Sequence, residues 1–132
     1  NAEARPGAEL LLEEIGFDVL IQNADLVITG EGHSDKQTLM GKLPQRILEH
    51  VLKCKESDKS HVVCSQLAGD CKSPESSFPL VWLVSGGVSD RQVMLDAGFD
   101  RVIQVTPEEM PLDEAMKPDV ARNNIIKAIK NK

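Results

Sequence analysis

The chain has 132 residues, about the size of one domain, and 41% of them are hydrophobic and 27% charged, as in an ordinary globular domain. At a net charge of −6 it lacks a basic stripe that would neutralise nucleic-acid phosphates, so we expect no nucleic-acid partner. No apolar run reaches the roughly 18 residues of a membrane-spanning helix, so we expect no membrane partner either.

The first predicted elements are a helix, a helical turn and a strand. Residues 6–16 fit a helix, because Pro6 suits the first helical position and Gly16 suits the left-handed residue after the end. The apolar stripe of this helix consists of Ala8, Leu11, Leu12 and Ile15. Residues 17–24 predict a short helical turn. Residues 25–30 predict a strand that is apolar on both faces, as is typical of a buried parallel strand.

The middle of the chain predicts a loop, a helix and one or two strands. The loop covers residues 30–43, and the helix covers residues 44–54. The inner face of this helix consists of Ile47, Leu48, Val51 and Leu52. Residues 61–69 and 80–87 each predict a strand, with a polar loop between them. The alternative is a single strand preceded by an insertion.

The last third predicts further alternation of helices and strands. Ser89 and Gln92 fit a capping box at the start of a helix that ends on Gly98. The remaining elements are a strand over 100–106, a short helix over 112–116 and a helix over 118–132. The inner face of the last helix consists of Ala121, Ile125, Ala128 and Ile129. Apolar strands alternating with helices predict a single α/β domain over residues 1–132, with a mainly parallel sheet flanked by helices.

Polar residues of unusual variety follow the first predicted strand. In an open parallel sheet, ligands lie beyond the carboxyl ends of the strands. Gly30 and Gly32 would let the backbone approach a ligand, and exposed N–H groups suit anions. Lys42 would supply a cation, and Glu31 or Asp35 would orient a hydroxyl or a magnesium ion. These groups suit phosphoryl transfer, although turn chemistry alone would also explain them.

Two common phosphate-binding motifs are not present in this stretch. A P-loop requires Ser or Thr after its Gly-Lys pair, but Leu43 follows Lys42, and Lys36 occupies the place of the first glycine. In the dinucleotide fingerprint, Asp35 stands at the position of the third glycine. The sequence therefore supports neither a P-loop nor a Rossmann cofactor site.

Other notable residues predict structural positions. Three histidines show no metal-ligand spacing and are expected at the surface: His33, His50 and His61. Three cysteines also lack such spacing and are expected to be reduced thiols: Cys54, Cys64 and Cys71. Trp82 is expected in the core. For Gly86 and Gly87 two alternatives stay open, a second anion-facing loop or an ordinary turn.

The stretch from residue 24 to residue 44 resembles the signature of the glycerate kinase family. The matching residues are Thr29, Gly30, Glu31, Gly32, Asp35, Gln37, Thr38, Gly41, Lys42 and Pro44. The resemblance continues over residues 5–27, 96–107, 110–116 and 121–125. One departure is His33, which stands where the family usually has arginine.

The resemblance implies an enzyme that phosphorylates glycerate with ATP and Mg²⁺, giving 2-phosphoglycerate. Glu31 and Asp35 would then orient glycerate or the metal, and Lys42 would neutralise developing charge; these three are the expected catalytic residues. The expected substrate- and phosphate-binding residues are Thr29, Gly30, Gly32, Gln37, Thr38 and Gly41. No separate set of metal ligands is assigned.

The resemblance also implies that this chain is part of something longer. Family members are considerably longer, and the chain resembles their C-terminal, flavodoxin-like portion, which is consistent with a start at Asn1. We therefore expect a cytoplasmic protein whose missing N-terminal part is its partner, and a chain that is inactive alone. An uncovered sheet edge would also permit a homo-oligomer.

The alternative is a non-catalytic α/β interaction domain, for example a receiver-like domain. Receivers need a phospho-accepting aspartate at a strand end and a lysine before a proline on the last strand. Here the first strand is expected to end on Gly30, and Thr106 precedes Pro107. Both positions count against a receiver.

Overall fold

The computed structural model describes residues 6–59 and 78–130. Its elements, in chain order, are α1 (Gly7–Glu14), α2 (Phe17–Ile21), β1 (Leu26–Ser34), the 3-10 helix η1 (Lys36–Leu39), α3 (Leu43–Lys59), β2 (Leu80–Val88), α4 (Arg91–Ala97), β3 (Arg101–Gln104), α5 (Leu112–Ala115) and α6 (Pro118–Lys130). The strand predicted over 61–69 and most of the loop after it lie outside the described residues.

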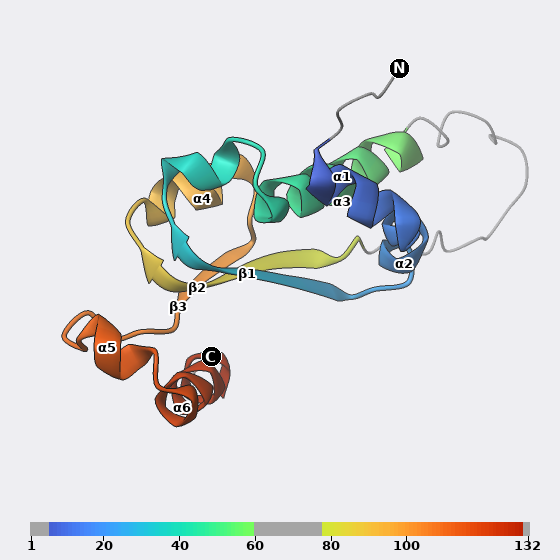
Figure 1. Ribbon diagram of the computed structural model, residues 1–132. Coiled ribbons are helices and arrows are strands. Elements are labelled where there is room, and N and C mark those ends of the chain that lie inside the picture. The colour runs from blue at the N-terminus through green and yellow to red at the C-terminus, as the bar shows by residue number, and fades with distance from the viewer. Residues whose placement is uncertain (1–5, 60–77, 131–132) are drawn as a thin grey trace, which may run out of the picture.

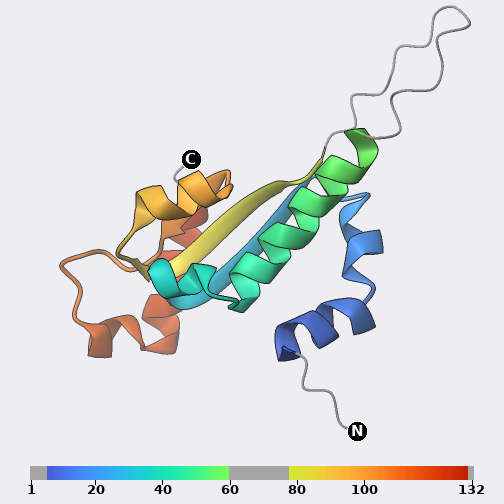
Figure 2. The same ribbon diagram turned by 90° about the horizontal axis from the view of Figure 1, so that it is seen from above.

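The described strands form one parallel sheet in the order β1-β2-β3. Figure 1 shows α3 and α4 on one face of this sheet and α6 on the other face. Seen from above in Figure 2, α3 runs along the sheet, with α4 on one side of it and α1 and α2 on the other. The predicted α/β class, with a parallel sheet flanked by helices, is confirmed. No helix in the described ranges is long and apolar enough to cross a membrane.

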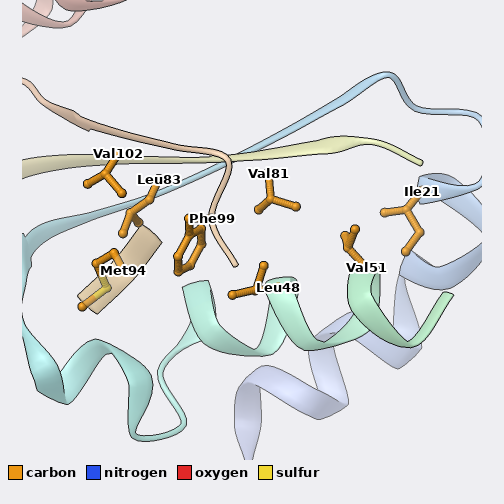
Figure 3. Packing of buried hydrophobic residues seen from close by; sticks show 8 residues of the cluster. All are labelled: Ile21, Leu48, Val51, Val81, Leu83, Met94, Phe99 and Val102. Carbon is orange, nitrogen blue, oxygen red and sulfur yellow. The ribbon is translucent and has the colours of Figure 1, made fainter. Parts of the chain in front are cut away.

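The main core lies between the sheet and the helices α3 and α4 (Figure 3). Its buried members are Ile21, Leu48, Val51, Val81, Leu83, Met94, Phe99 and Val102. The predicted inner face of α3 is confirmed, since Ile47, Leu48 and Val51 are buried and Leu52 packs against this cluster. Trp82 is also buried, as predicted, and the Arg101 guanidinium lies 5.1 Å from the centre of its ring.

One predicted loop turns out to be partly strand. β1 continues past Gly30 as far as Ser34, so the loop predicted over 30–43 begins too early. β2 runs through Gly86 and Gly87, in agreement with the strand predicted over 80–87, so these glycines form neither a turn nor an anion-facing loop. Glycine and polar residues resembled turn chemistry here, but the two segments pair with each other as neighbouring strands, as in the register of His33 with Gly87. Pairing between strands decided the structure of these residues.

Close approach of the strands explains two of these glycines. A Cβ built on Gly30 would lie 2.8 Å from the carbonyl oxygen of Val84, and a Cβ on Gly86 would overlap the carbonyl oxygen of Gly32. Any larger residue at either position would push β1 and β2 apart. Gly32 differs, because a Cβ there would meet no atom within 4 Å.

Several faces predicted to be buried are exposed in the described structure. Ile28 on β1 is 51% exposed, so β1 is not buried on both faces. On α1 only Leu12 is buried, whereas Leu11 and Ile15 are 54% and 50% exposed. On α6 the buried residue is Asn124, and Ile125 is 43% exposed. The periodic pattern identified the helices correctly, but apolar periodicity does not say whether a neighbour is present to cover them.

The helix ends match the predictions in part. Gly16 and Gly98 take positive φ values of 64° and 117° after α1 and α4, as predicted. Pro6 precedes α1 as its N-cap instead of occupying the first helical position. The predicted capping box at Ser89 is wrong, because Asp90 is the N-cap of α4 and Gln92 bonds to Asp96.

Candidate active site at the end of strand β1

A carboxylate links the end of β1 to the 3-10 helix that follows it. Glu31 lies on β1, opposite Ser85 of β2. Its Oε1 atom accepts a hydrogen bond from the Ser34 hydroxyl at 2.8 Å and another from the Thr38 hydroxyl at 2.6 Å. Ser34 and Thr38 are fully buried, while Glu31 is half-buried. A single carboxylate oxygen therefore holds the strand end and η1 together.

Asp35 caps the 3-10 helix through a reciprocal pair of hydrogen bonds. Its Oδ1 atom accepts the backbone N–H of Gln37 at 2.8 Å, and its own N–H donates to the Thr38 hydroxyl oxygen at 3.2 Å. This arrangement is the capping box that satisfies N–H groups at a helix start. The turn chemistry that the sequence left open is thus present at Asp35 and Thr38.

The turn after η1 leads into α3 through Gly41 and Lys42. Gly41 has a φ of 91°, a conformation that favours glycine, and its N–H donates to Gln45 Oε1 at 2.5 Å. The Lys42 side chain is exposed, and no ion pair to it occurs in the part of the chain that the structure describes. Its ammonium group is therefore available to a ligand.

His33 and Ser89 form a contact that the sequence did not predict. His33 Nε2 lies 2.8 Å from the Ser89 hydroxyl, so the end of β1 is tied to the segment between β2 and α4. The imidazole lies over Gly87, where a Cβ would come within 2.7 Å of Nδ1. His33 is exposed, as predicted. No sequence signal joins two residues 56 positions apart; only the pairing of β1 with β2 brings them together.

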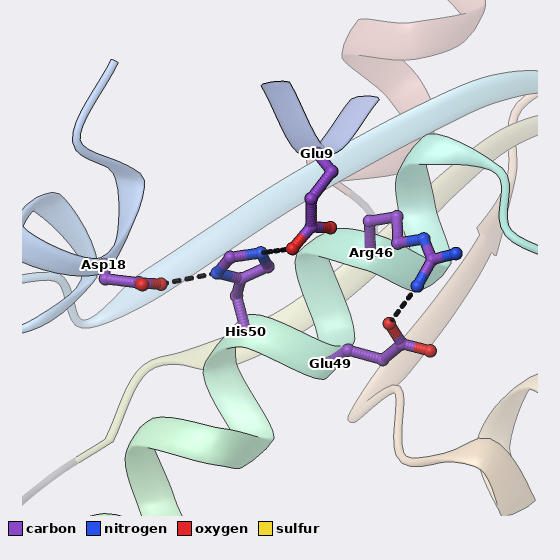
Figure 4. A network of polar contacts seen from close by, with 5 residues as sticks. All are labelled: Glu9, Asp18, Arg46, Glu49 and His50. Carbon is purple, nitrogen blue, oxygen red and sulfur yellow. Dashed lines mark hydrogen bonds and ion pairs between the residues drawn. The ribbon is translucent and has the colours of Figure 1, made fainter. Parts of the chain in front are cut away.

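A second polar cluster joins α1, α2 and α3 (Figure 4). His50 of α3 lies between two carboxylates, with Nδ1 2.5 Å from Asp18 Oδ1 and Nε2 3.4 Å from Glu9 Oε1. The prediction of a surface histidine is wrong here, because His50 is only 7% exposed. The ring also meets Phe17 edge-on, at 5.9 Å between centroids. This cluster fastens the N-terminal helices to α3.

Comparison with known proteins places the chain in a family. The model of the glycerate kinase family matches residues 1–131. The chain belongs to this family. The motif that resembled the glycerate kinase signature is therefore the segment that builds the end of β1, η1 and the start of α3.

Three curated relatives are named glycerate kinase. The chain is 29% identical to the protein from Bacillus subtilis over 118 residues, which cover 89% of this chain and 25% of the relative. It is 27% identical to that from Halalkalibacterium halodurans over 117 residues, covering 89% and 25%. It is 32% identical to that from Bacillus cereus over 127 residues, covering 96% and 27%. The chain spans about a quarter of the length of the curated relatives it matches.

The glycerate kinase motif residues fall into three groups in space. Glu31, Asp35, Gln37 and Thr38 are joined by hydrogen bonds at the end of β1. Gly30 and Thr29 belong to β1 itself, with Thr29 buried and 5% exposed. Gly41 and Lys42 follow on the turn into α3.

Ser34 also belongs to the first group, although no sequence pattern predicted it. In a regular strand, residues three apart point to opposite faces, so the spacing of Glu31 and Ser34 gave no reason to expect contact. Their 2.8 Å hydrogen bond arises where β1 ends and the chain turns into η1.

Proposed function

We propose that the protein containing this chain is a glycerate kinase, which transfers the γ-phosphate of ATP to glycerate and gives 2-phosphoglycerate. One observation carries the proposal: the family's motif forms a hydrogen-bonded carboxylate cluster at the carboxyl end of a parallel strand. That edge is where α/β proteins bind ligands. The family membership and the names of three relatives support the same activity.

In this proposal each motif residue has its own role in phosphoryl transfer. Lys42, exposed beside the start of α3, neutralises charge that develops on the transferred phosphoryl group. Glu31 orients the hydroxyl of glycerate, and Gly32 lets the backbone approach a ligand, because nothing fills the space beside it. Gln37 is exposed and available to a phosphate oxygen. Gly30, Gly41 and Thr29 shape the backbone around these groups.

Magnesium would enter the site together with ATP. No group of three or more His, Cys, Asp or Glu side chains within the described residues is arranged to hold a metal ion. Mg²⁺ in phosphoryl-transfer sites is usually held by one or two carboxylates and the substrate phosphates. Asp35 Oδ2 and Glu31 Oε2 accept no hydrogen bond among the described residues, so these carboxylates fit that limited role. The bound ion would neutralise phosphate charge.

The proposed active protein is longer than this chain. Because the chain spans about a quarter of its relatives, we infer that residues 1–132 are one α/β domain from the C-terminal portion of a cytoplasmic kinase. The preceding part of the same protein would complete the pocket. The chain on its own would then be inactive, whether or not the protein forms a homo-oligomer.

The test is ATP-dependent phosphorylation of D-glycerate by the full-length protein. Lys42→Ala is expected to lower kcat by about a hundredfold, the usual effect of removing one charge-stabilising donor. Lys36→Ala is the matched control, since Lys36 is also an exposed lysine of this motif and has no assigned role. Its kcat should stay within about twofold. Conversion of the product by enolase distinguishes 2-phosphoglycerate from the 3-phosphate.

Absence of phosphorylation in the unaltered full-length protein would refute the proposed function. Equal rates for Lys42→Ala and Lys36→Ala would remove Lys42 from the mechanism while leaving the kinase activity itself intact.

A further inference from the structure

The hydrogen bonds around Glu31 have a defined direction. A backbone N–H can only donate, so the bond between Asp35 N and Thr38 Oγ1 uses the hydroxyl oxygen of Thr38 as an acceptor. The single hydroxyl proton of Thr38 is then donated to Glu31 Oε1. The Ser34 hydroxyl donates to the same oxygen. The hydroxyls of Ser34 and Thr38 thus converge on Oε1 of Glu31, and the Asp35 N–H fixes the direction of the Thr38 hydroxyl.

Burial separates the residues that can touch a ligand from those that cannot. Ser34 and Thr38 are 0% exposed, so their hydroxyls are out of reach of a ligand in this structure. Glu31 is half-buried, and its Oε2 atom accepts no hydrogen bond from the described residues. Within this cluster, Oε2 of Glu31 is therefore the carboxylate oxygen left for a ligand.

Ser34 is itself held firmly by the main chain. Its carbonyl oxygen accepts the N–H of Ser89 at 2.9 Å, so the end of β1 is joined to the segment that precedes α4. Ser34 also pairs in register with Val88 of β2. Because the backbone of Ser34 is held by its pairing with β2 and by the hydrogen bond from Ser89, its hydroxyl can hold the Glu31 carboxylate in one orientation.

We propose that Ser34 and Thr38 are positioning residues, which hold the Glu31 carboxylate so that Oε2 faces the reacting hydroxyl of the phosphoryl acceptor. The inference rests on the proposed kinase function. It assigns Ser34 a part in the site, and it gives Thr38 an indirect role through Glu31 instead of direct contact with phosphate. Preorientation of one oxygen removes the need to order the carboxylate during the reaction.

The first experiment measures the kinetics of the full-length protein. Thr38→Val is nearly isosteric and removes only the hydroxyl, whereas Thr38→Ser keeps it. We expect Thr38→Val and Ser34→Ala each to lower kcat by about tenfold, with KM for ATP within about twofold, as for loss of one hydrogen bond to a charged group. Thr38→Ser should restore kcat to within about threefold of the unaltered protein.

A double-mutant cycle separates positioning from simple stabilisation. In a Glu31→Gln background, Thr38→Val should lower kcat by less than about twofold, because its effect passes through the carboxylate. Ser85→Ala is the matched control, since Ser85 is a buried serine of the adjacent strand whose hydroxyl donates to Gly87 O. Its kcat should stay within about threefold even if the protein is less stable.

A second measurement stands apart from catalysis. In protein labelled with ¹³C at glutamate carboxyls, Glu31→Gln identifies the Glu31 resonance; Thr38→Val and Ser34→Ala should both displace it, and Ser85→Ala should not. If the Glu31 resonance keeps its chemical shift in Thr38→Val and Ser34→Ala, the proposal is overturned. An undiminished effect of Thr38→Val in the Glu31→Gln background would also overturn it. If the unaltered protein phosphorylates no glycerate, the proposed function fails, and the resonance alone decides the positioning role.

Discussion

At the scale of single residues, glycines of this chain serve opposite purposes. Gly86 lacks a side chain because the backbone of β1 lies against it, and a Cβ would overlap the Gly32 carbonyl oxygen. Gly32 has open space on its free side, with no atom within 4 Å of a built Cβ. Packing accounts for the first glycine but not for the second, and the proposed approach of a ligand to the backbone would account for it.

Alanine at these two positions should therefore have different effects. We expect Gly86→Ala to lower the free energy of unfolding by about 1–3 kcal/mol, because the obstructing atom belongs to the backbone and cannot rotate away. Gly32→Ala should change it by less than about 1 kcal/mol, yet weaken substrate binding in the full-length protein. Urea unfolding and substrate titration measure the two effects. Equal destabilisation by both variants would contradict the steric explanation.

At the scale of elements, the N-terminal helices depend on a few contacts with α3. Of α1 and α2 only Leu12 and Ile21 are buried, whereas Leu11, Val19 and Leu20 are all more than half exposed. The polar contacts of His50 with Asp18 and Glu9 supplement this small apolar contact. The contacts of the His50 side chain with α1 and α2 therefore add to the packing of Ile21 and Phe17 against the core.

Removal of that side chain should loosen these two helices selectively. His50→Ala is expected to cost about 1–3 kcal/mol, since it removes the hydrogen bond to Asp18 and leaves a space in the contact. Amide hydrogen exchange should accelerate in α1 and α2 more than in β2, because the polar contacts of His50 join α1 and α2 to α3. His33→Ala, at an exposed histidine, serves as the control. Uniform acceleration across all elements would show that α1 and α2 do not open separately.

At the scale of the whole molecule, the described sheet has three strands and leaves apolar side chains of β1 and β2 exposed. Ile28 of β1 and Leu80 of β2 are 51% and 49% exposed. Most sheets of α/β proteins have more strands than this and are covered on both faces. Together with the quarter-length match to the relatives, these features support the proposal that other parts of a longer protein complete the pocket.

We therefore expect kinase activity in the full-length protein and not in the 132-residue chain. We expect the 132-residue chain, expressed alone, to form no detectable phosphoglycerate from ATP and glycerate, because only one side of the proposed pocket is present. The full-length protein should form it under the same conditions. Phosphate transfer is measured with labelled ATP, and circular dichroism checks that the short chain is folded. Turnover by the folded short chain would show that its site is complete.

The sequence determined most of the elements and the location of the candidate site. Apolar periods of 3.6 identified α1, α3 and α6, helix-end signals identified α4, and short apolar runs identified the strands β1, β2 and β3, because these patterns follow from the geometry of the backbone itself. The motif between Thr29 and Lys42 also pointed to the carboxyl end of β1. Local chemistry was sufficient for these predictions.

The tertiary structure alone decided which contacts these residues make. Strand pairing extended β1 beyond Gly30 into the predicted loop, and it brought His33 to Ser89 across 56 positions. The bend after β1 joined Ser34 and Thr38 to Glu31. Helix packing buried His50 and left Ile15 exposed. The contact of His33 with Ser89 and the burial of His50 depend on neighbours distant in the chain, and a local pattern carries no information about them.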